Sequence, residues 1–412
     1  MELTNVPKKI VLISSGQPSL NPRLVKEADS LANAGYAVTV LYAYWNDWGT
    51  ALDKTILPAK KWNAVRVGGD PQEKPVIFFL SRLIHRLSLL ILKVTGIKYF
   101  AKFAIARSSF FLLRKARKYK ADLYIGHNLG ALPVVVKAAE IHKKPCGFDA
   151  EDFHRHEVSD DIDNFDVQLK INIEESYIHR LCYLTASSPG ISAAYQQLFQ
   201  DQAQTTILNV FPAGNQIAEP GLTADATLKL FWFSQTIGQG RGLNDCIKAL
   251  HLLNNPNIEL HLLGFVTDEN RQQLTATARD SVKLIFYKPV PPDDIPVLAS
   301  QFDIGLAPED SIPLNRDICL TNKIFTYLQA GLAIIASDTT AQKQLLNKHP
   351  GIGKVYENGS VEMLAAAIQH YVDDRDDLYK TKKVSYAVAR NELNWEKESE
   401  KFLKVISDTL SA

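Results

Sequence analysis

The stretch Leu230 to Gly242, LFWFSQTIGQGRG, decides the fold of this chain. Its apolar first half runs into a turn with Gly238, Gly240 and Gly242, and an apolar helix is predicted to begin at Leu243. This succession is typical of a buried parallel strand followed by its crossover helix. Glycines let the backbone approach a ligand closely, and the amino end of a helix offers free N–H groups with partial positive charge. The turn is therefore a candidate anion site.

Two basic residues of this sequence lie at candidate anion sites. Arg241 lies in the turn and can hold a phosphate through two hydrogen bonds. The glycine spacing matches neither a dinucleotide fingerprint nor a P-loop, which disfavours a dehydrogenase or an ATPase. A second segment, Leu320 to Gly331 (LTNKIFTYLQAG), predicts a helix that opens with Asn322 and Lys323. Lysine in the first turn opposes the helix dipole, which favours a bound anion there, with a solvated lysine as the alternative.

The alternation of strand and helix extends outward from these segments in both directions. The predicted strands are 8–15, 37–44, 64–67, 121–126, 145–148 and 182–186 in the first half, then 229–233, 258–263, 282–286, 303–307 and 333–336. Such a series predicts two doubly wound parallel sheets, with ligands bound in a cleft at the carboxyl ends of both. We expect a first domain at 1–208, a second domain at 209–385 and a terminal helix at 386–412.

Composition excludes several classes of protein. The chain has 412 residues, 46% hydrophobic and 22% charged, which is typical of globular domains and not of disordered or fibrous chains. Its four cysteines are scattered, so neither a disulfide framework nor a thiolate zinc site is indicated, and a reducing cytoplasm fits best. No stretch is expected to reach the roughly 18 apolar residues of a membrane span.

Charge is distributed very unevenly along the chain. Residues 1–120 carry 20 Lys and Arg against 7 Asp and Glu, and no acidic residue occurs between Glu73 and Asp122. Apolar residues at helical spacing within 76–118 predict two basic amphipathic helices with a break near Gly96. We expect them to dock on an anionic membrane surface; the alternative is that their apolar faces are core. Nucleic acid is disfavoured, because the aromatic residues do not form a stacking platform.

Five segments in order carry a resemblance to a known family. They are Asn21-Pro22-Arg23 with the helix to Gly35, Ala121 to His127, Leu230 to Gly242, Lys323 to Gly331, and Asn394-Trp395-Glu396. Together the chain resembles a GT-B glycosyltransferase of family 4, the retaining group 1 type that uses sugar nucleotides. The resemblance implies two Rossmann-like domains facing a central cleft: an acceptor-binding domain at 1–208 and a donor-binding domain at 209–385, with the terminal helix at 386–412 crossing back to the first domain. It also implies a UDP- or GDP-linked donor, retention of configuration, and neither a metal nor a further cofactor.

The resemblance also implies roles for particular residues. Arg241 and Lys323 would hold the diphosphate of the donor. Thr236 and Gly16 would lie near it, and Glu309 or Asp310 could contact the donor sugar. The remaining expected donor-site residues are Gly238, Gly240, Asn322 and Thr326.

This sequence departs from the family at two places. Ile318 and Thr326 stand where the family usually has two glutamates. The usual acceptor-domain histidine after the strand ending at Phe148 is replaced by Glu151, within the acid- and histidine-rich segment Asp149 to His156 (DAEDFHRH). Glu151 and His127 are therefore candidate catalytic residues; a charged surface loop and, less favoured, a metal site are the alternatives.

The predicted function is that of a cytoplasmic enzyme, peripheral on the inner face of the membrane. It would move a sugar from a nucleotide donor to a lipid-linked or polysaccharide acceptor in cell-envelope or exopolysaccharide synthesis. The alternatives are a non-catalytic subunit that binds sugar nucleotides, and a sugar-nucleotide epimerase on the same fold.

Overall fold

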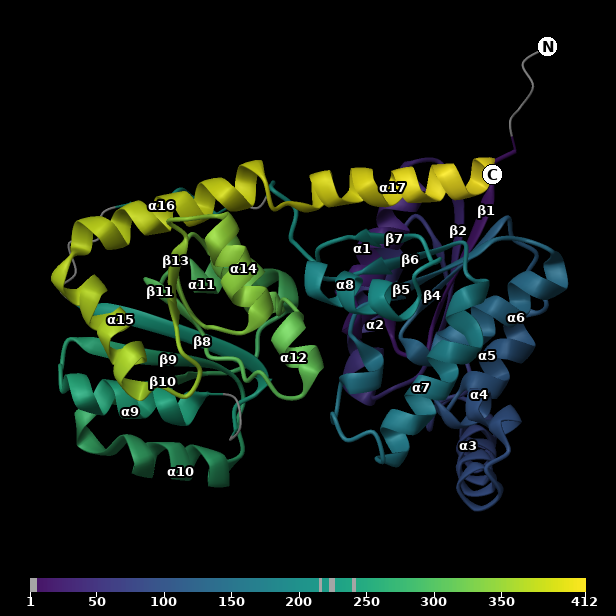
Figure 1. The fold of residues 1–412 in the computed structure, drawn as a ribbon, viewed down its shortest axis with the longest axis horizontal. Coiled ribbons are helices and arrows are strands. Elements are labelled where there is room, and N and C mark those ends of the chain that lie inside the picture. The colour runs from purple at the N-terminus through teal and green to yellow at the C-terminus, as the bar shows by residue number, and fades with distance from the viewer. Residues whose placement is uncertain (1–5, 215–216, 222–226, 239–241) are drawn as a thin grey trace, which may run out of the picture. The chain divides into compact units, whose positions relative to one another are not determined.

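The computed structural model of the protein describes residues 6–214, 217–221, 227–238 and 242–412. Within them the chain divides into two compact units, each built on one parallel sheet. Unit 1 comprises 1–207 and 399–412, and unit 2 comprises 208–398. Helices flank the sheet of each unit (Figure 1). The predicted fold class, two Rossmann-like α/β domains, is confirmed.

The sheet of unit 1 has seven parallel strands in the order β3-β2-β1-β4-β5-β6-β7. The strands are β1 Lys9–Ser14, β2 Ala37–Ala43, β3 Asn63–Val67, β4 Leu123–His127, β5 Cys146–Ala150, β6 Tyr183–Ala186 and β7 Gln204–Thr206. The helices are α1 Pro22–Asn33, α2 Asp47–Ile56, α3 Pro75–Thr95, α4 Ala101–Ala104, α5 Ser109–Ala116, α6 Leu132–His142, α7 Phe165–Tyr177 and α8 Pro189–Leu198. The order reverses between β1 and β4, so ligand-binding loops are expected at the carboxyl ends of these two strands.

The sheet of unit 2 has six parallel strands in the order β10-β9-β8-β11-β12-β13. The strands are β8 Leu228–Thr236, β9 Ile258–Phe265, β10 Lys283–Tyr287, β11 Ile304–Ala307, β12 Ala333–Ser337 and β13 Gly353–Tyr356. The helices are α9 Leu243–Leu253, α10 Asp268–Ala278, α11 Ile295–Ala299, α12 Leu314–Ile318, α13 Asn322–Ala330, α14 Thr340–Lys348, α15 Val361–Asp373 and α16 Arg375–Asn391. Here the order reverses between β8 and β11.

Both faces of the unit 2 sheet are buried, as a continuous apolar strand predicts. Leu230 and Trp232 of β8 belong to one core cluster, whereas Phe231 between them belongs to the cluster on the opposite face. Phe231 stacks on Phe302 with ring centroids 4.6 Å apart. The strand is thus held from both sides, and its carboxyl end at Thr236 is placed by this packing.

The last helix, α17 Trp395–Ser411, follows a break after α16. Its residues from Ser399 onward group with unit 1. Near its end, Lys8 Nζ donates a hydrogen bond to the carbonyl oxygen of Leu410 at 2.9 Å. The expected terminal helix over 386–412 is therefore two helices, because α16 continues to Asn391 and a new helix starts at Trp395.

Several elements were not anticipated from the sequence. Helices α2, α12 and α15 and the short strands β7 and β13 are absent from the series that the sequence predicts. β7 and β13 are edge strands of three and four residues, and β7 is only partly buried, so neither shows a strong apolar run. The basic segment is divided more finely than predicted, into α3, α4 and α5.

Helix α3 also corrects the expectation that no stretch could span a membrane. It has 21 residues, and its most apolar 18-residue window has a mean hydropathy of 1.7 with 17% of the window buried. By length and composition alone, α3 could cross a bilayer.

Candidate active site

In unit 2 the strand order reverses between β8 and β11, and the expected donor-site residues gather at the carboxyl ends of these strands. Thr236 is the exposed last residue of β8, and Glu309 and Asp310 follow β11. Asn322 and Lys323 begin α13, which packs against β11. Loops at such a reversal form the usual ligand site of an open parallel sheet.

Gly242 brings the amino end of α9 to this edge. Its φ is 72°, and a Cβ atom at this position would lie 2.3 Å from the carbonyl oxygen of Pro308. Only glycine accepts both the left-handed backbone and that approach. The first N–H groups of α9 are therefore held beside the end of β11, as an anion site at a helix amino end requires.

Of three expected residues in the glycine turn, the structure describes one. Gly238 is described and lies close to Asn270, which would be 3.3 Å from an added Cβ. Gly240 and Arg241 lie outside the described residues, so the predicted phosphate contact of Arg241 stays a prediction.

Lys323 has an anionic partner within its own unit. Its side chain is 10% exposed, and Nζ donates a hydrogen bond to Glu309 Oε1 at 2.6 Å. The ammonium also lies 5.5 Å from the centre of the Trp232 ring. Lysine at this turn was expected to indicate a bound anion, and the anion that the structure shows there is the Glu309 carboxylate. A phosphate that binds Lys323 would share the cation with Glu309 or displace it.

The other expected donor-site residues differ in exposure. Asn322 is exposed and accepts a hydrogen bond from Asn209 at 2.9 Å. Asp310 lies 3.3 Å from Arg316, and burial raises the pKa of its carboxyl, with Glu309 adding to the effect. Thr326 is 1% exposed and packed inside the unit. Ile318 is buried as well, so both positions that depart from the family pattern contribute to packing.

In unit 1 the corresponding reversal lies between β1 and β4. Ser14, the last residue of β1, donates a hydrogen bond to Asn128 Oδ1 at 2.9 Å. Gly16 N–H donates to the Ser14 hydroxyl at 3.1 Å. Asn128 is the residue directly after β4, and its φ of 64° lies in the left-handed region. The expected ligand contact of Gly16 therefore falls at the reversal, where a tight polar turn positions it.

His127, the last residue of β4, is completely buried and surrounded by carboxylates. Its Nε2 lies 3.2 Å from Glu27, and its Nδ1 lies 3.5 Å from Asp149 and 3.4 Å from Glu151. Burial disfavours the charged imidazole, but these carboxylates outweigh it and raise the pKa of His127 well above its usual range. The predicted catalytic role for His127 by direct contact with substrate conflicts with this burial, since no edge of its ring reaches the surface.

Arg23 completes the buried cluster from helix α1. Its Nη2 donates a hydrogen bond to Asp149 Oδ1 at 2.6 Å, and its Nε lies 3.4 Å from Glu27. Nη1 donates to the carbonyl oxygen of Ile207. Burial raises the pKa of Asp149, but the charges of Arg23 and His127 prevail and hold it well below its usual range. Two cations thus stabilise the carboxylates inside unit 1.

A metal ion is a weaker interpretation of this cluster. Glu27, His127 and Asp149 each offer a ligand atom, and these atoms lie within 4.8 Å of one another. However, Arg23 already binds Asp149 through two nitrogens, and both ring nitrogens of His127 face carboxylates of the protein. The chemistry of the set therefore fits an ion-pair network better than a metal centre.

Glu151 is the member of this group that reaches the surface. It follows β5, and its side chain is 22% exposed. Asn21 Nδ2 donates a hydrogen bond to Glu151 Oε1, while Asn21 Oδ1 caps α1 by accepting from Leu24 N–H at 2.9 Å. The segment Asn21-Pro22-Arg23 thus contacts Asp149 and Glu151, which both belong to the acid- and histidine-rich segment Asp149 to His156.

The rest of the acid- and histidine-rich segment serves to build unit 1. His154 is buried near Glu157, which raises the pKa of the imidazole against the effect of burial. Arg155 is held by Glu174 in α7. Sequence reasoning missed Arg23, Glu27 and Asp149 as parts of the cluster; the available signal was that Arg23 and Glu27 lie among the apolar positions of α1 and that Asp149 lies near the end of β5.

Comparisons with known proteins agree with this geometry. Residues 229–374, within unit 2, match the family model described as Glycosyl transferases group 1. No curated protein sequence matches the chain. Its fold is similar to that of Alr3699/HepE from Anabaena in complex with UDP, with a TM-score of 0.67, 14% identity and coverage of 97% of this chain and 100% of that one.

Two further solved structures have the same fold. Sucrose-phosphate synthase from Thermosynechococcus elongatus has a TM-score of 0.71 at 13% identity, over 98% of this chain and 99% of that one. WaaG, described as a glycosyltransferase involved in lipopolysaccharide biosynthesis, has a TM-score of 0.61 at 13% identity, over 96% and 99%. At these identities the likeness shows the fold.

Proposed function

We propose that the protein transfers a sugar from a nucleotide-diphosphate donor to a hydroxyl group of an acceptor, with retention of configuration. The observation that carries the proposal is the edge of unit 2, where Gly242 sets the amino end of α9 against Pro308 and Lys323 lies in the first turn of α13. When the bond from the sugar to the diphosphate breaks, negative charge develops on the leaving phosphate. Fixed N–H groups and a cation that lie at this edge would stabilise that charge.

The chemistry proposed for this edge needs neither a protein nucleophile nor a metal. Lys323 would hold the diphosphate in competition with Glu309, and Arg241 would add a second cation from the glycine turn. Glu309, once released from Lys323, has its carboxylate free to accept a hydrogen bond from a donor hydroxyl. We take UDP or GDP as the leaving group, since binding at this edge would rely on the diphosphate.

We further propose that the acceptor is lipid-linked, or a growing polysaccharide of the cell envelope, and that the protein works at the inner face of the membrane. Support comes from α3, whose inward side carries Phe78, Ser81 and Ser88. Its outward side carries apolar residues at alternating spacings of four and three, all exposed: Val76, Leu80, Leu83, Leu87, Leu90 and Val94. The alternative that the apolar residues of the basic segment are core is wrong for these six positions, which are exposed, whereas Phe78 of α3 and Leu112 and Leu113 of α5 are buried.

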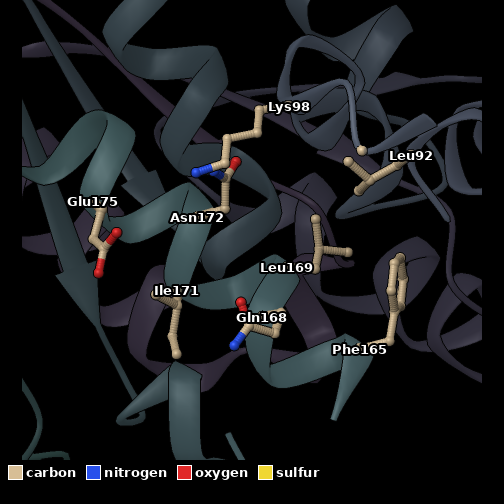
Figure 2. A pocket seen from close by; sticks show the side chains of 9 residues that line it. Leu92, Lys98, Phe165, Gln168, Leu169, Ile171, Asn172 and Glu175 are labelled. Carbon is tan, nitrogen blue, oxygen red and sulfur yellow. The ribbon is translucent and has the colours of Figure 1, made fainter. Parts of the chain in front are cut away.

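Charge favours a lipid surface over a second copy of the chain on α3. Arg82, Arg86 and Lys93 lie along the helix, and no acidic residue occurs between Glu73 and Asp122. Two copies paired through this face would bring like charges together, whereas anionic lipids attract each nearby cation by about 1 kcal/mol. An open groove of about 190 Å³ lies where the end of α3 meets α7, with Leu92, Phe165 and Leu169 on its apolar side and Lys98 near Asn172 (Figure 2).

A donor-binding experiment tests the proposed function directly. The full chain is titrated with UDP, GDP and their glucose, galactose and N-acetylglucosamine conjugates, and its thermal unfolding is followed. A ligand present at about 100 times its dissociation constant adds roughly 2.7 kcal/mol of stability. Transfer is then measured with the donor that stabilises most and a detergent extract of envelope lipids. Stabilisation by no sugar nucleotide would contradict the proposal.

One alternative is supported by a specific observation. Ile318 and Thr326 are buried where the family usually has glutamates, and Lys323 is already paired with Glu309. Both features suit a subunit that binds a sugar nucleotide without turning it over. Such a protein would show donor-dependent stabilisation but neither transfer nor slow hydrolysis of the donor, so the same experiment separates the two functions.

A further inference from the structure

The Glu151 carboxylate is held from two sides at the carboxyl edge of the unit 1 sheet. Asn21 donates a hydrogen bond to Oε1 from the start of α1, and His127 Nδ1 lies 3.4 Å from the same oxygen at the end of β4. The side chain is nevertheless 22% exposed. A carboxylate that is fixed at one oxygen and open to solvent can still accept hydrogen bonds from outside the protein.

Both partners of Glu151 are themselves immobilised. Asn21 Oδ1 caps α1, so its amide cannot rotate without loss of the cap. His127 lies between Glu27 and Asp149, and Asp149 is held by Arg23 and by the Thr185 hydroxyl at 2.7 Å. The buried network thus extends from α1 through β4 and β5 to β6. Such a shell limits the positions that the Glu151 carboxylate can adopt.

The network has features that a purely structural role would not need. Four ionisable side chains, Arg23, Glu27, His127 and Asp149, are each at most 1% exposed. Burial of paired charges contributes little net stability compared with apolar residues of similar size. All four lie around the partly exposed Glu151 carboxylate. This carboxylate lies at the carboxyl ends of the strands, next to the reversal of strand order, where ligands of parallel sheets bind.

We infer that Glu151 accepts a hydrogen bond from the attacking hydroxyl of the acceptor, and that Asn21 and His127 are positioning residues that aim its carboxylate. The inference rests on the proposed function and names the acceptor-side contact of that reaction. The ligand group is a neutral hydroxyl, since a carboxylate attracts hydrogen-bond donors and repels phosphate. His127 acts through Glu151 and does not touch the substrate, in agreement with its burial.

Three variants test the inference. Glu151→Gln keeps the shape and removes the charge; we expect transfer to the acceptor to fall at least tenfold, while the affinity for the donor, measured by titration, stays that of the wild type. His127→Gln removes the imidazolium, and we expect both transfer and melting temperature to fall. Asn21→Ser retains an oxygen to cap α1 but loses the amide that holds Glu151. It folds stably and lowers transfer, which covers the case in which His127→Gln does not fold.

A double-mutant cycle separates positioning from a structural role. If Asn21 acts through Glu151, Asn21→Ser causes no further loss of transfer in the Glu151→Gln background. Losses that multiply, or Glu151→Gln transfer equal to that of the wild type, would overturn the inference. Glu140→Gln on α6 is the matched control and is expected to transfer normally. A wild-type chain with neither transfer nor donor hydrolysis would instead refute the proposed function, and the inference with it.

Discussion

Lys323 and Glu309 form a short ion pair in unit 2, at the carboxyl ends of the strands where their order reverses, with Nζ 2.6 Å from Oε1. The pair joins the first turn of α13 to the loop after β11. The lysine opposes the dipole of its own helix, and the carboxylate offsets that cost. A diphosphate at the same place would meet a cation that is already oriented by its partner.

Lys323→Gln is expected to weaken the binding of UDP- or GDP-sugars by about tenfold to a hundredfold. The reason is the loss of one charge-assisted hydrogen bond, worth about 1.5–3 kcal/mol. Isothermal titration of the full chain measures the effect, and Lys348→Gln, an exposed lysine at the end of α14, is the matched control. Wild-type affinity in Lys323→Gln would mean that the lysine serves only Glu309.

Removal of the apolar outward side of α3 is expected to abolish membrane binding. A triple variant with Leu83, Leu87 and Leu90 changed to Asp introduces charges on residues that are 52%, 48% and 58% exposed, so folding is retained. Cosedimentation with vesicles that contain phosphatidylglycerol measures binding. Leu252→Asp, at a similarly exposed position on α9, is the control and should bind as the wild type does.

Salt dependence distinguishes a lipid surface from self-association at α3. Binding of the wild type to anionic vesicles should fall as salt rises from 50 to 500 mM, because ions screen the attraction of Arg82, Arg86 and Lys93. Vesicles of phosphatidylcholine alone should bind weakly. A salt-independent dimer, detected by sedimentation without lipid, would instead assign the face to a second copy of the chain.

The stability of the protein should depend on His127 in a pH-dependent way. The carboxylates of Glu27, Asp149 and Glu151 hold the pKa of His127 above its ordinary value of about 6.5, with Arg23 close by. The stabilisation is therefore fully present below about pH 6.5 and is lost as pH rises through the raised folded pKa. Urea unfolding at pH 6 and pH 9.5 measures the difference in the free energy of unfolding between wild type and His127→Gln, and this difference should be smaller at pH 9.5. An equal difference at both pH values would mean that His127 stabilises the fold through packing alone.

Two adjacent lysines on α16 should have very different effects on stability. Lys382 is buried, and its Nζ donates hydrogen bonds to Asp303 at 2.9 Å and to the carbonyl oxygen of Phe302 at 3.0 Å. Lys382→Met leaves the buried Asp303 without its cation and should cost about 3–5 kcal/mol. Lys383 is paired with Glu219 at the surface, and Lys383→Met should leave the free energy of unfolding almost unchanged. Chemical denaturation measures the free energy of unfolding of both variants. Equal losses of stability would contradict the expectation that only the buried ion pair of Lys382 and Asp303 stabilises the fold.

Much of the fold was predictable because its signal is local. A strand that is buried on both faces must be apolar along its buried length, so Ile10 to Ile13 of β1, Leu230 to Phe233 of β8 and Ala333 to Ala336 of β12 stand out as continuous apolar runs. The edge strands β7 and β13 carry no such run and were missed. The glycine at 242 also has a local signature, although its reason, the contact with Pro308, lies far along the chain.

The candidate site was predictable only in part. Sequence indicated Lys323, Glu309, His127 and Glu151 as polar residues at strand or helix ends, because ends of parallel strands share one edge. It could not show that Lys323 pairs with Glu309 or that Arg23 reaches Asp149, since these partners are brought together by the order of the strands. Thr326 was expected at the nucleotide but is packed inside unit 2.

By itself, therefore, the sequence determined the alternation of strands and helices, the two parallel sheets and the excess of cations in the first 120 residues. Each of these follows from the periodicity or composition of contiguous residues. Only the tertiary structure decided that the apolar residues of α3 face outward and that His127 is buried among carboxylates. Both outcomes depend on which neighbours pack against a side chain, and residues distant in sequence supply those neighbours.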